Sequence, residues 1–290
     1  MARTLFRRAK QAGRRRRVAV SPLRAVDRAL RLLDLMANGS PRVGVSELAR
    51  ATGWSKAVVF RMLRTLELHG YVARDETRRY LLGTKPLELA GAVLRRSELH
   101  HVARPALLAL AERTGESVVL TAPTPRGAIC LDTVDSPQQL RASFRIGRVI
   151  PWHAGAAGKL HLAYLPAQQA DGILAQPLRR FTERTITDPG RIRDDLARIR
   201  EQGYAFTVGE LDPGVAAISV PVLDWRGEMV AAVSLGGPAS RFTEDRLPAL
   251  LREVQRAAEA ISVRLLGGSS TSGGAGRQRQ GISQRKEGGV

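Results

Sequence analysis

The stretch VSELARATGWSKAVVFRMLR, residues 45–64, decides the fold of the first part of the chain. It predicts one helix that leads up to Thr52 and a second from Ser55 to His69. Gly53 lies between them, where the chain must leave the first helix in a left-handed conformation that glycine adopts at little cost. Ser55 suits the N-cap of the second helix. Two steeply crossing helices would bring together the residues Leu48, Ala49, Trp54, Val59 and Met62. The pattern is typical of a helix-turn-helix.

The second helix of this pair presents a largely cationic face to solvent. Its outward residues are Lys56, Ala57, Phe60, Arg61 and Arg64. Such a face suits the major groove of DNA, where lysine and arginine bind phosphates and the edges of bases. We expect sequence specificity to depend on the first four of these residues. Phe60 is placed either to meet a thymine methyl group or to pack on a neighbouring hairpin.

The charge of the chain is uneven. The 290 residues have a formal net charge of +19, of which +14 belongs to residues 1–86, +2 to residues 87–266 and +3 to residues 267–290. A positive N-terminal part implies a polyanionic partner. Residues 1–20 are expected to be a disordered basic arm, which either contacts DNA or is an unstructured leader. Residues 267–290 are expected to be a flexible tail.

Composition excludes several classes of protein. The sequence is 43% hydrophobic without an apolar run near the ~20 residues of a membrane span, so we expect a cytoplasmic protein with no membrane partner. Cys130, the single cysteine, lies in an apolar run and is interpreted as a small buried hydrophobe. The histidines form no HExxH or Cys/His cluster, and there is no GxSxG elbow. We therefore expect no metal, no cofactor and no catalytic residue.

A helix is expected before the helix-turn-helix, over residues 21–37. Val26, Leu30 and Leu33 recur at helical spacing there. Ser21 suits the N-cap of this helix, and Pro22 suits its first helical position.

A wing is expected after the helix-turn-helix. Apolar residues on both sides of a charged turn predict two short strands within residues 70–83. Arg78 and Arg79 in this turn are candidate contacts to phosphate or the minor groove. A solvated basic hairpin is the alternative interpretation.

The rest of the chain predicts an α+β domain. Residues 85–114 read as helix, divided near Pro105, and the first piece is expected to link two domains and to pack on a second subunit. Helical runs are expected after Pro151, over residues 188–203 and from about Glu244 to Leu266. The strand-like runs are SVVLTAP, AICLDTV, LRASF, YAFTV, AAISVPVLD and MVAAVSLGG. Strands joined by hairpins predict a mostly antiparallel sheet.

One loop of this domain is a candidate binding site. Residues 151–159, PWHAGAAGK, are rich in small residues and directly precede a helical run. Backbone amides at such a junction can hold a carboxylate, helped by the helix dipole. The spacing is wrong for a phosphate-binding P-loop, because Leu160 stands where serine or threonine is required. Close packing of the loop against the sheet is the alternative.

These blocks, in this order, resemble the IclR family of bacterial transcriptional regulators. The resemblance covers Ser21 to about Leu266 and includes VDRALRLLDLMA, the helix-turn-helix and wing, LAERTGESVVL, LDTVDSPQQLR, PWHAGAAGKLHLAYLP, TITDP, IREQGYAF and VPVLDWRGEMVAAVSLGGPASRF. It implies a winged helix-turn-helix over residues 21–84, a dimerising linker helix over 85–102 and a GAF-like effector-binding domain over 103–266. It also implies a homodimer or homotetramer bound to a palindromic promoter site in double-stranded DNA.

The resemblance also assigns roles to residues. DNA contacts would come from Ser55, Lys56, Ala57, Arg61, Arg78 and Arg79, while Ser46 would cap its helix and touch phosphate. A small organic or aromatic acid would sit under the amides of Ala156 and Ala157. The opposite wall would include Thr207, Ala217 and Ser234.

Four positions depart from the family pattern. Thr207 stands where some members have an acidic residue, Ala217 where some have cysteine, and Gly236 where some have serine. The pocket is therefore expected to be less polar and to favour an aromatic acid over a two- or three-carbon keto acid. Arg78 stands where the family usually has glycine.

We expect a sequence-specific DNA-binding regulator, a repressor rather than an activator, that is controlled by a small acid. Two alternative functions belong to other classes of protein: an enzyme and a nonspecific nucleic-acid binder. An enzyme that uses the α+β domain would need a nucleophile or metal set, which the sequence lacks. A nonspecific nucleic-acid binder driven by the basic arm would lose its binding when residues 1–20 are deleted.

Overall fold

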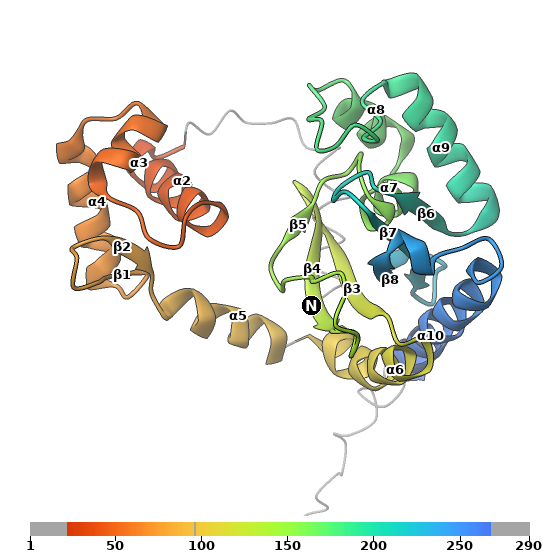
Figure 1. Cartoon of the computed structure of the whole chain (residues 1–290). Coiled ribbons are helices and arrows are strands. Elements are labelled where there is room, and N and C mark those ends of the chain that lie inside the picture. Colours follow the sequence, from red (N-terminus) through yellow and green to blue (C-terminus); the bar gives the residue numbers. More distant parts are fainter. Residues whose placement is uncertain (1–21, 96, 268–290) are drawn as a thin grey trace, which may run out of the picture. The chain divides into compact units, whose positions relative to one another are not determined.

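The structure, a computed structural model, describes residues 22–95 and 97–267. The basic arm, the Ser21 cap and the tail from residue 268 lie outside the described residues. Contacts divide the chain into two compact units that part between Glu98 and Leu99 (Figure 1). No helix in the described ranges is long and apolar enough to cross a membrane.

The N-terminal unit holds the helix-turn-helix that residues 45–64 predict. Gly53 ends the first helix of the motif at φ 72°, and its N–H donates to the carbonyl of Ala49 at 2.9 Å. The Ser55 hydroxyl accepts from the N–H of Val58 at 3.4 Å and caps the second helix. The elements of this unit are α2 (Arg24–Asn38), α3 (Val45–Thr52), α4 (Lys56–Leu68), β1 (Val72–Arg74), β2 (Tyr80–Leu82) and α5 (Lys85–Arg95).

The start of α2 differs from the expectation. The helix begins at Arg24, so Pro22 lies outside it. Val26 and Leu30 are 53% and 58% exposed, while Leu32 and Met36 enter the core with α4. Helical spacing reveals an apolar stripe but does not say which side of it another element covers.

Ser46 does not cap α3, and that expectation is wrong. The helix already begins at Val45, so Ser46 lies inside its first turn and Gly44 is the N-cap. The Glu47 carboxylate accepts the Gly44 N–H at 3.2 Å, as the third helical residue does in a capping box. Ser46 remains exposed, so its proposed phosphate contact is unaffected.

The expected break near Pro105 is also wrong. The helix breaks between Arg95 and Glu98, and Pro105 lies inside α6 (Glu98–Thr114). Leu107 and Leu110 of α6 are fully buried against the sheet, which holds the helix together around the proline. Pro105 is exposed, and because it has no N–H it cannot donate the usual helical hydrogen bond to the fourth residue before it.

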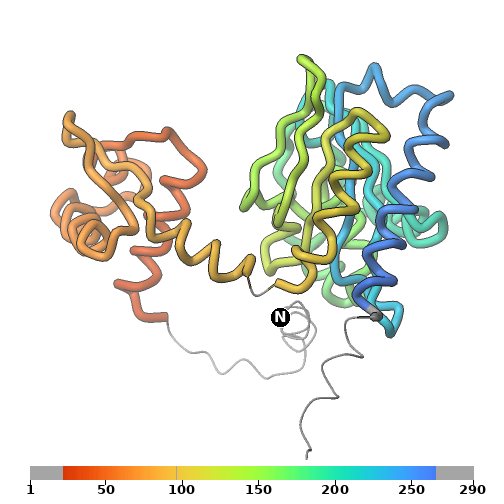
Figure 2. The backbone as a smooth tube through the Cα atoms, turned by 90° about the horizontal axis from the view of Figure 1, so that it is seen from below, coloured from red at the N-terminus to blue at the C-terminus, as the bar shows by residue number. Residues whose placement is uncertain are grey.

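The C-terminal unit is built on one six-stranded antiparallel sheet with the order β5-β4-β3-β8-β7-β6. One face carries α6 and α10 (Leu247–Gly267), which Figures 1 and 2 show side by side, and the other carries α7 (Ala156–Ala163), α8 (Ala167–Leu174) and α9 (Pro189–Gln202). The strands are β3 (Ser117–Thr124), β4 (Gly127–Val134), β5 (Val149–Ile150), β6 (Ala205–Val208), β7 (Val215–Leu223) and β8 (Met229–Pro238). This confirms the α+β fold class.

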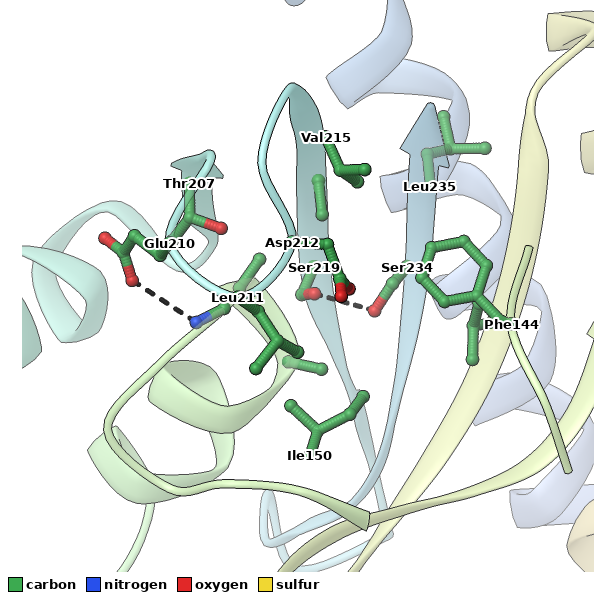
Figure 3. A pocket seen from close by; sticks show the side chains of 15 residues that line it. Phe144, Ile150, Thr207, Glu210, Leu211, Asp212, Val215, Ser219, Ser234 and Leu235 are labelled. Atoms are coloured by element: carbon green, nitrogen blue, oxygen red, sulfur yellow. Dashed lines mark hydrogen bonds between the residues drawn. The ribbon is translucent and has the colours of Figure 1, made fainter. Parts of the chain in front are cut away.

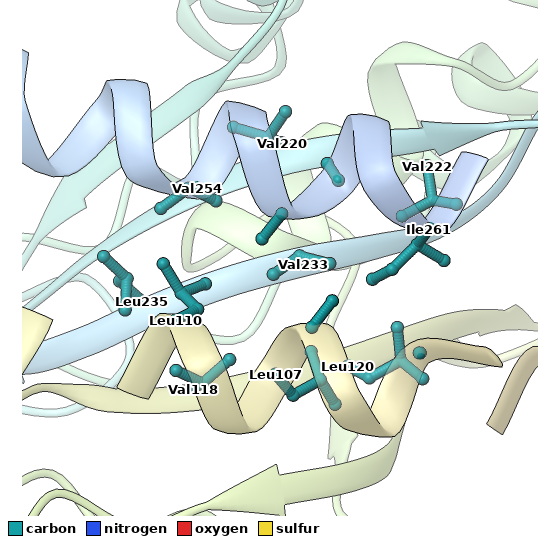
Figure 4. Packing of buried hydrophobic residues seen from close by; sticks show 14 of the residues in the cluster. Leu107, Leu110, Val118, Leu120, Val220, Val222, Val233, Leu235, Val254 and Ile261 are labelled. Carbon is teal, nitrogen blue, oxygen red and sulfur yellow. The ribbon is translucent and has the colours of Figure 1, made fainter. Parts of the chain in front are cut away.

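The core of this unit lies between the sheet and the α6–α10 layer. Leu107 and Leu110 of α6 face Val254 and Ile261 of α10 across the buried side chains of the central strands (Figure 4). Because this layer supports β3 and β8 from behind, the opposite face of the same strands is a rigid wall for α7.

The LRASF run is not a strand. Residues 140–144 form no strand, and β5 takes the place beside β4. The carbonyl of Ala142 accepts from the hydroxyl of Ser117 at 2.7 Å, and Phe144 turns toward a cavity. The alternating pattern is therefore misleading here: Ala142 is buried and Phe144 is half-buried without strand pairing, while Leu140 is exposed.

Cys130 is expected to be unreactive in the folded protein. Its side chain lies in β4 and is 2% exposed, and burial raises the pKa of the thiol to about 12. At pH 8 we expect 5,5′-dithiobis(2-nitrobenzoate) to leave the native chain unmodified and to release about one equivalent of thiolate once guanidinium unfolds it. Rapid modification of the native chain would contradict this burial.

Candidate functional site

The exposed face of α4 brings together the residues expected to contact DNA. Lys56, Ala57, Phe60, Arg61 and Arg64 are all exposed, and Ser55 lies at the N-terminal end of the same helix. Phe60 is 42% exposed. Arg64 donates to the Glu67 carboxylate at 2.8 Å, so part of its hydrogen-bonding capacity is used within the helix.

The wing is held by Asp75. Its carboxylate accepts from the hydroxyl of Thr77 at 2.7 Å and from the N–H of Arg79 at 2.9 Å, and these hydrogen bonds keep the Asp75 pKa below its ordinary value. Arg78 stands at the turn with φ 61°, a left-handed conformation that costs a residue with a Cβ about 1–2 kcal/mol. A glycine would adopt this conformation without that cost.

The two wing arginines have different surroundings. Arg79 donates to the Glu47 carboxylate at 2.9 Å and to the Arg42 carbonyl at 2.9 Å, which ties the wing to α3. Arg78 is exposed at the tip of the turn. The structure thus leaves the Arg78 guanidinium available for a phosphate and makes Arg79 a brace between wing and helix.

The effector residues named from the sequence line one cavity in the C-terminal unit. Ala156 and Ala157 form the first turn of α7, and Ala217 lies on β7. Thr207 on β6 and Ser234 on β8 line the same cavity (Figure 3). The cavity is small, about 50 Å³. The first N–H groups of a helix have no acceptor inside it, so this end of α7 is suited to an anion.

Glycines bring α7 close to the sheet. Gly155 precedes the helix at φ 76°, a conformation that favours glycine. A Cβ on Gly158 would lie 2.0 Å from the carbonyl oxygen of Pro151. The close packing of the loop and its suitability for a ligand are therefore two results of the same small residues.

A buried charge network beneath the cavity was missed by the sequence analysis. The Glu210 carboxylate accepts from the N–H of Gly155 at 3.2 Å and from the ammonium of Lys159 at 2.5 Å. Lys159, whose side chain is 1% exposed, also donates to Asp195 at 2.8 Å. The network thus joins three parts of the unit: the start of α7, the loop that follows β6, which holds Glu210, and helix α9, which holds Asp195. Its members are far apart in sequence, so no local pattern indicates the pairing.

Polar side chains also lie in the largely apolar wall of the cavity. Besides Thr207 and Ser234, they include Ser219, Glu210 and Asp212. Most of these groups already have partners: the hydroxyls of Ser219 and Ser234 lie 2.6 Å apart, and Asp212 accepts two hydrogen bonds from Arg148.

Gly236 leaves room for an aromatic ring at the cavity wall. A Cβ on Gly236 would lie 2.4 Å from Cζ of Phe144, whose ring narrows the cavity (Figure 3). Gly236→Ala is therefore expected to displace Phe144 and to lower the melting temperature, with the displacement visible in a crystal structure.

The control for this substitution is Gly172→Ala in α8. A Cβ there meets no atom within 4 Å and needs no left-handed backbone, so it should leave the melting temperature unchanged or raise it slightly. Equal effects of the two substitutions would contradict the role of Phe144.

The buried histidines serve packing. His161 on α7 lies 3.0 Å from the Thr121 hydroxyl, and complete burial lowers its pKa to about 3, so the ring is neutral at pH 7. His153 lies 2.8 Å from the Arg179 carbonyl. In the part of the chain that the structure describes, no group of His, Cys, Asp and Glu could hold a metal ion.

A basic, exposed helix in one unit and a small cavity at a helix N-terminus in the other are the features of a ligand-responsive DNA-binding protein. Family models match both units: the IclR helix-turn-helix domain over residues 25–76 and the bacterial transcriptional regulator IclR C-terminal domain over residues 91–263. The chain belongs to the IclR family of bacterial transcriptional regulators. It is a DNA-binding regulator with an effector-binding domain, and not an enzyme.

Individual relatives agree with this assignment. The HTH-type transcriptional regulator BhcR of Paracoccus denitrificans is 35% identical over 242 residues, which is 83% of this chain and 86% of that protein. The transcriptional repressor IclR of Escherichia coli is 30% identical over 259 residues, 87% of this chain and 94% of that protein. A crystal structure of an IclR homolog from Microbacterium hydrocarbonoxydans, complexed with 4-hydroxybenzoate, has a TM-score of 0.70 at 24% identity and covers 83% of this chain and 98% of that one.

Proposed function

We propose that this regulator acts in the cytoplasm as a repressor at palindromic promoter sites and is controlled by a small carboxylic acid, with aromatic acids preferred. The observation that carries the proposal is the convergence of Ala156, Ala157, Thr207, Ala217 and Ser234 on one cavity at the start of α7. A relative that is named a repressor supports the direction of control. Control requires that the acid bind two arrangements of the protein with different affinities.

The effector is proposed to bind through its carboxylate. The amides of Ala156 and Ala157 would donate to it, aided by the helix dipole. The remaining wall is largely apolar and suits a ring, with Phe144, Ile150, Leu211 and Leu235 among its residues. The cavity of about 50 Å³ is smaller than the roughly 150 Å³ that holds benzene. An aromatic acid would therefore have to move Phe144 or Leu211, and the 4-hydroxybenzoate complex of the Microbacterium homolog supports this ligand class.

The effector proposal is tested by thermal shift on the full chain. Benzoate and 4-hydroxybenzoate are expected to raise the melting temperature more than glyoxylate or pyruvate at equal concentration. Ala156→Pro removes one amide donor at the first helical position, where proline is tolerated, and should abolish the shift. Stabilisation by the keto acids alone would contradict the aromatic preference.

The oligomer is proposed to form through apolar surface of the linker helix. Leu87, Leu89 and Val93 of α5 are 74%, 47% and 52% exposed, more apolar surface than a solitary helix usually presents. A homodimer or homotetramer would match a palindromic site. Light scattering that found only single chains at micromolar concentration would contradict this proposal.

The DNA proposal is tested by gel shift with the DNA upstream of the protein's own coding sequence. Specific binding should exceed that to competitor DNA and weaken steeply with salt. A chain that lacks residues 1–20 separates the two modes of binding. The proposed regulator should lose affinity but keep its site preference, whereas loss of all binding would favour a nonspecific binder driven by the arm.

A further inference from the structure

A second concave surface lies on the C-terminal unit, outside the effector cavity. The end of α6 meets the beginning of α10 in a pocket of about 390 Å³, and none of its lining residues lines the effector cavity. Both helices are held from beneath by the core (Figure 4). The pocket therefore sits on rigid elements. Its charged residues are Arg113, Arg246, Arg252, Glu253 and Arg256.

This pocket has an excess of positive charge. Glu253 is its single carboxylate, and it accepts from Arg113 at 2.6 Å and from Arg256 at 2.8 Å. The hydrogen bond from Arg113 holds the pKa of Glu253 below its ordinary value. Among residues 22–95 and 97–267, no acidic side chain forms an ion pair with Arg246 or Arg252. Several guanidinium groups thus share one carboxylate, and a bound anion would relieve their repulsion.

The chemistry of the pocket fits a phosphate group. Guanidinium groups present forked N–H donors that match the oxygens of phosphate, and several arginines can share one dianion. Small-molecule sites range from about 300 to 1,000 Å³, so the size of the pocket fits a compact ligand. We propose that the α6–α10 pocket binds the phosphate group of a small organic phosphate.

An adjoining pocket indicates what the phosphate carries. A depression of about 180 Å³ shares Arg113 and Arg256 with the first pocket and continues along the same two helices. Besides the two shared arginines, its lining consists of one further arginine, Arg264, and the apolar residues Pro105, Ala106, Ala109, Ala257 and Ala260. Because roughly 150 Å³ suffices for benzene, this apolar extension holds one ring or a short alkyl group. The ligand class is thus a phosphate monoester with a compact apolar substituent.

Calorimetric titration of the full chain with phenyl phosphate and with inorganic phosphate, in about 0.15 M salt, tests the site. The variant Arg246→Ala with Arg252→Ala removes two exposed guanidinium groups. Its matched control is Arg145→Ala with Arg191→Ala, two exposed arginines that line neither pocket. Phenyl phosphate should bind the pocket variant at least about tenfold more weakly than the unchanged chain, because hydrogen bonds to charged groups are lost. The control should bind as the unchanged chain does.

Ala260→Trp tests the apolar extension. Ala260 is exposed, so the larger side chain fills the depression without disturbing the core. This variant should bind phenyl phosphate no better than inorganic phosphate, whereas the unchanged chain prefers phenyl phosphate. A preference that survives Ala260→Trp would overturn the apolar part of the proposal.

Equal affinities of the pocket variant and its control for phenyl phosphate would overturn the site as a whole. A gel shift with the same two variants distinguishes the source of the phosphate. If the pocket variant loses affinity for DNA and the unchanged chain binds neither small phosphate, the arginines contact the DNA backbone and the small-molecule site is overturned.

Discussion

Replacing Lys159 with methionine is expected to lower the unfolding free energy of the C-terminal unit by about 3–5 kcal/mol. Lys159 is almost completely buried, and its ammonium holds both Glu210 and Asp195. Methionine fills similar space but leaves the Glu210 carboxylate with the Gly155 N–H as its remaining close partner. The cost arises because a buried charge loses its counterion, and urea unfolding of the full chain measures it.

Two further variants make this prediction specific. Arg198→Met removes the other cation beside Asp195, but the Arg198 side chain is 65% exposed, so its loss should cost at most about 1 kcal/mol. Glu210→Gln combined with Lys159→Met removes both buried charges and should be less destabilising than the two single substitutions added together. Additive effects would contradict a direct Lys159–Glu210 coupling.

Replacing Arg61 with alanine is expected to weaken binding to the operator by about 1–3 kcal/mol, roughly 5- to 150-fold. Arg61 is exposed on the face of α4 that we propose reads the major groove. A base contact contributes to specificity, so binding to competitor DNA should change much less. Gel shifts on operator and competitor at the same salt concentration give both affinities.

Arg78→Ala is the comparison variant for Arg61→Ala, because it should remove a phosphate contact and not a base contact. We propose that Arg78 meets phosphate, so its loss should weaken operator and competitor binding alike and reduce the slope of log K against log salt by about 1. The substitution leaves the left-handed backbone at φ 61° in place, so a thermal melt checks that the wing still folds. If Arg61→Ala also weakens both DNAs equally, Arg61 is a backbone contact and not a base contact.

Local sequence signals predicted the DNA-binding unit because each of its features is decided by near neighbours. Gly53 ends α3 in the left-handed conformation, Ser55 caps α4, and the cationic residues of α4 fall on one face by helical period alone. Likewise α9 forms within the expected range 188–203, where Asp188 caps the helix and Gly203 ends it. The small residues before α7 led us to propose a ligand site there without knowledge of the fold, and they line one cavity in the structure.

What the sequence by itself determined is therefore the fold class, most of the helices and strands, the Gly53 turn with the Ser55 cap, and the residues that one helix face or one loop brings together. Only the tertiary structure decided which apolar stripe of α2 is covered, that α6 continues through Pro105, and that residues 140–144 turn Phe144 toward Gly236. It alone paired Lys159 with Glu210, and it alone gathered arginines of α6 and α10 into one pocket. The physical reason is range: caps and turns depend on adjacent residues, whereas burial and charge pairing depend on contacts between distant ones.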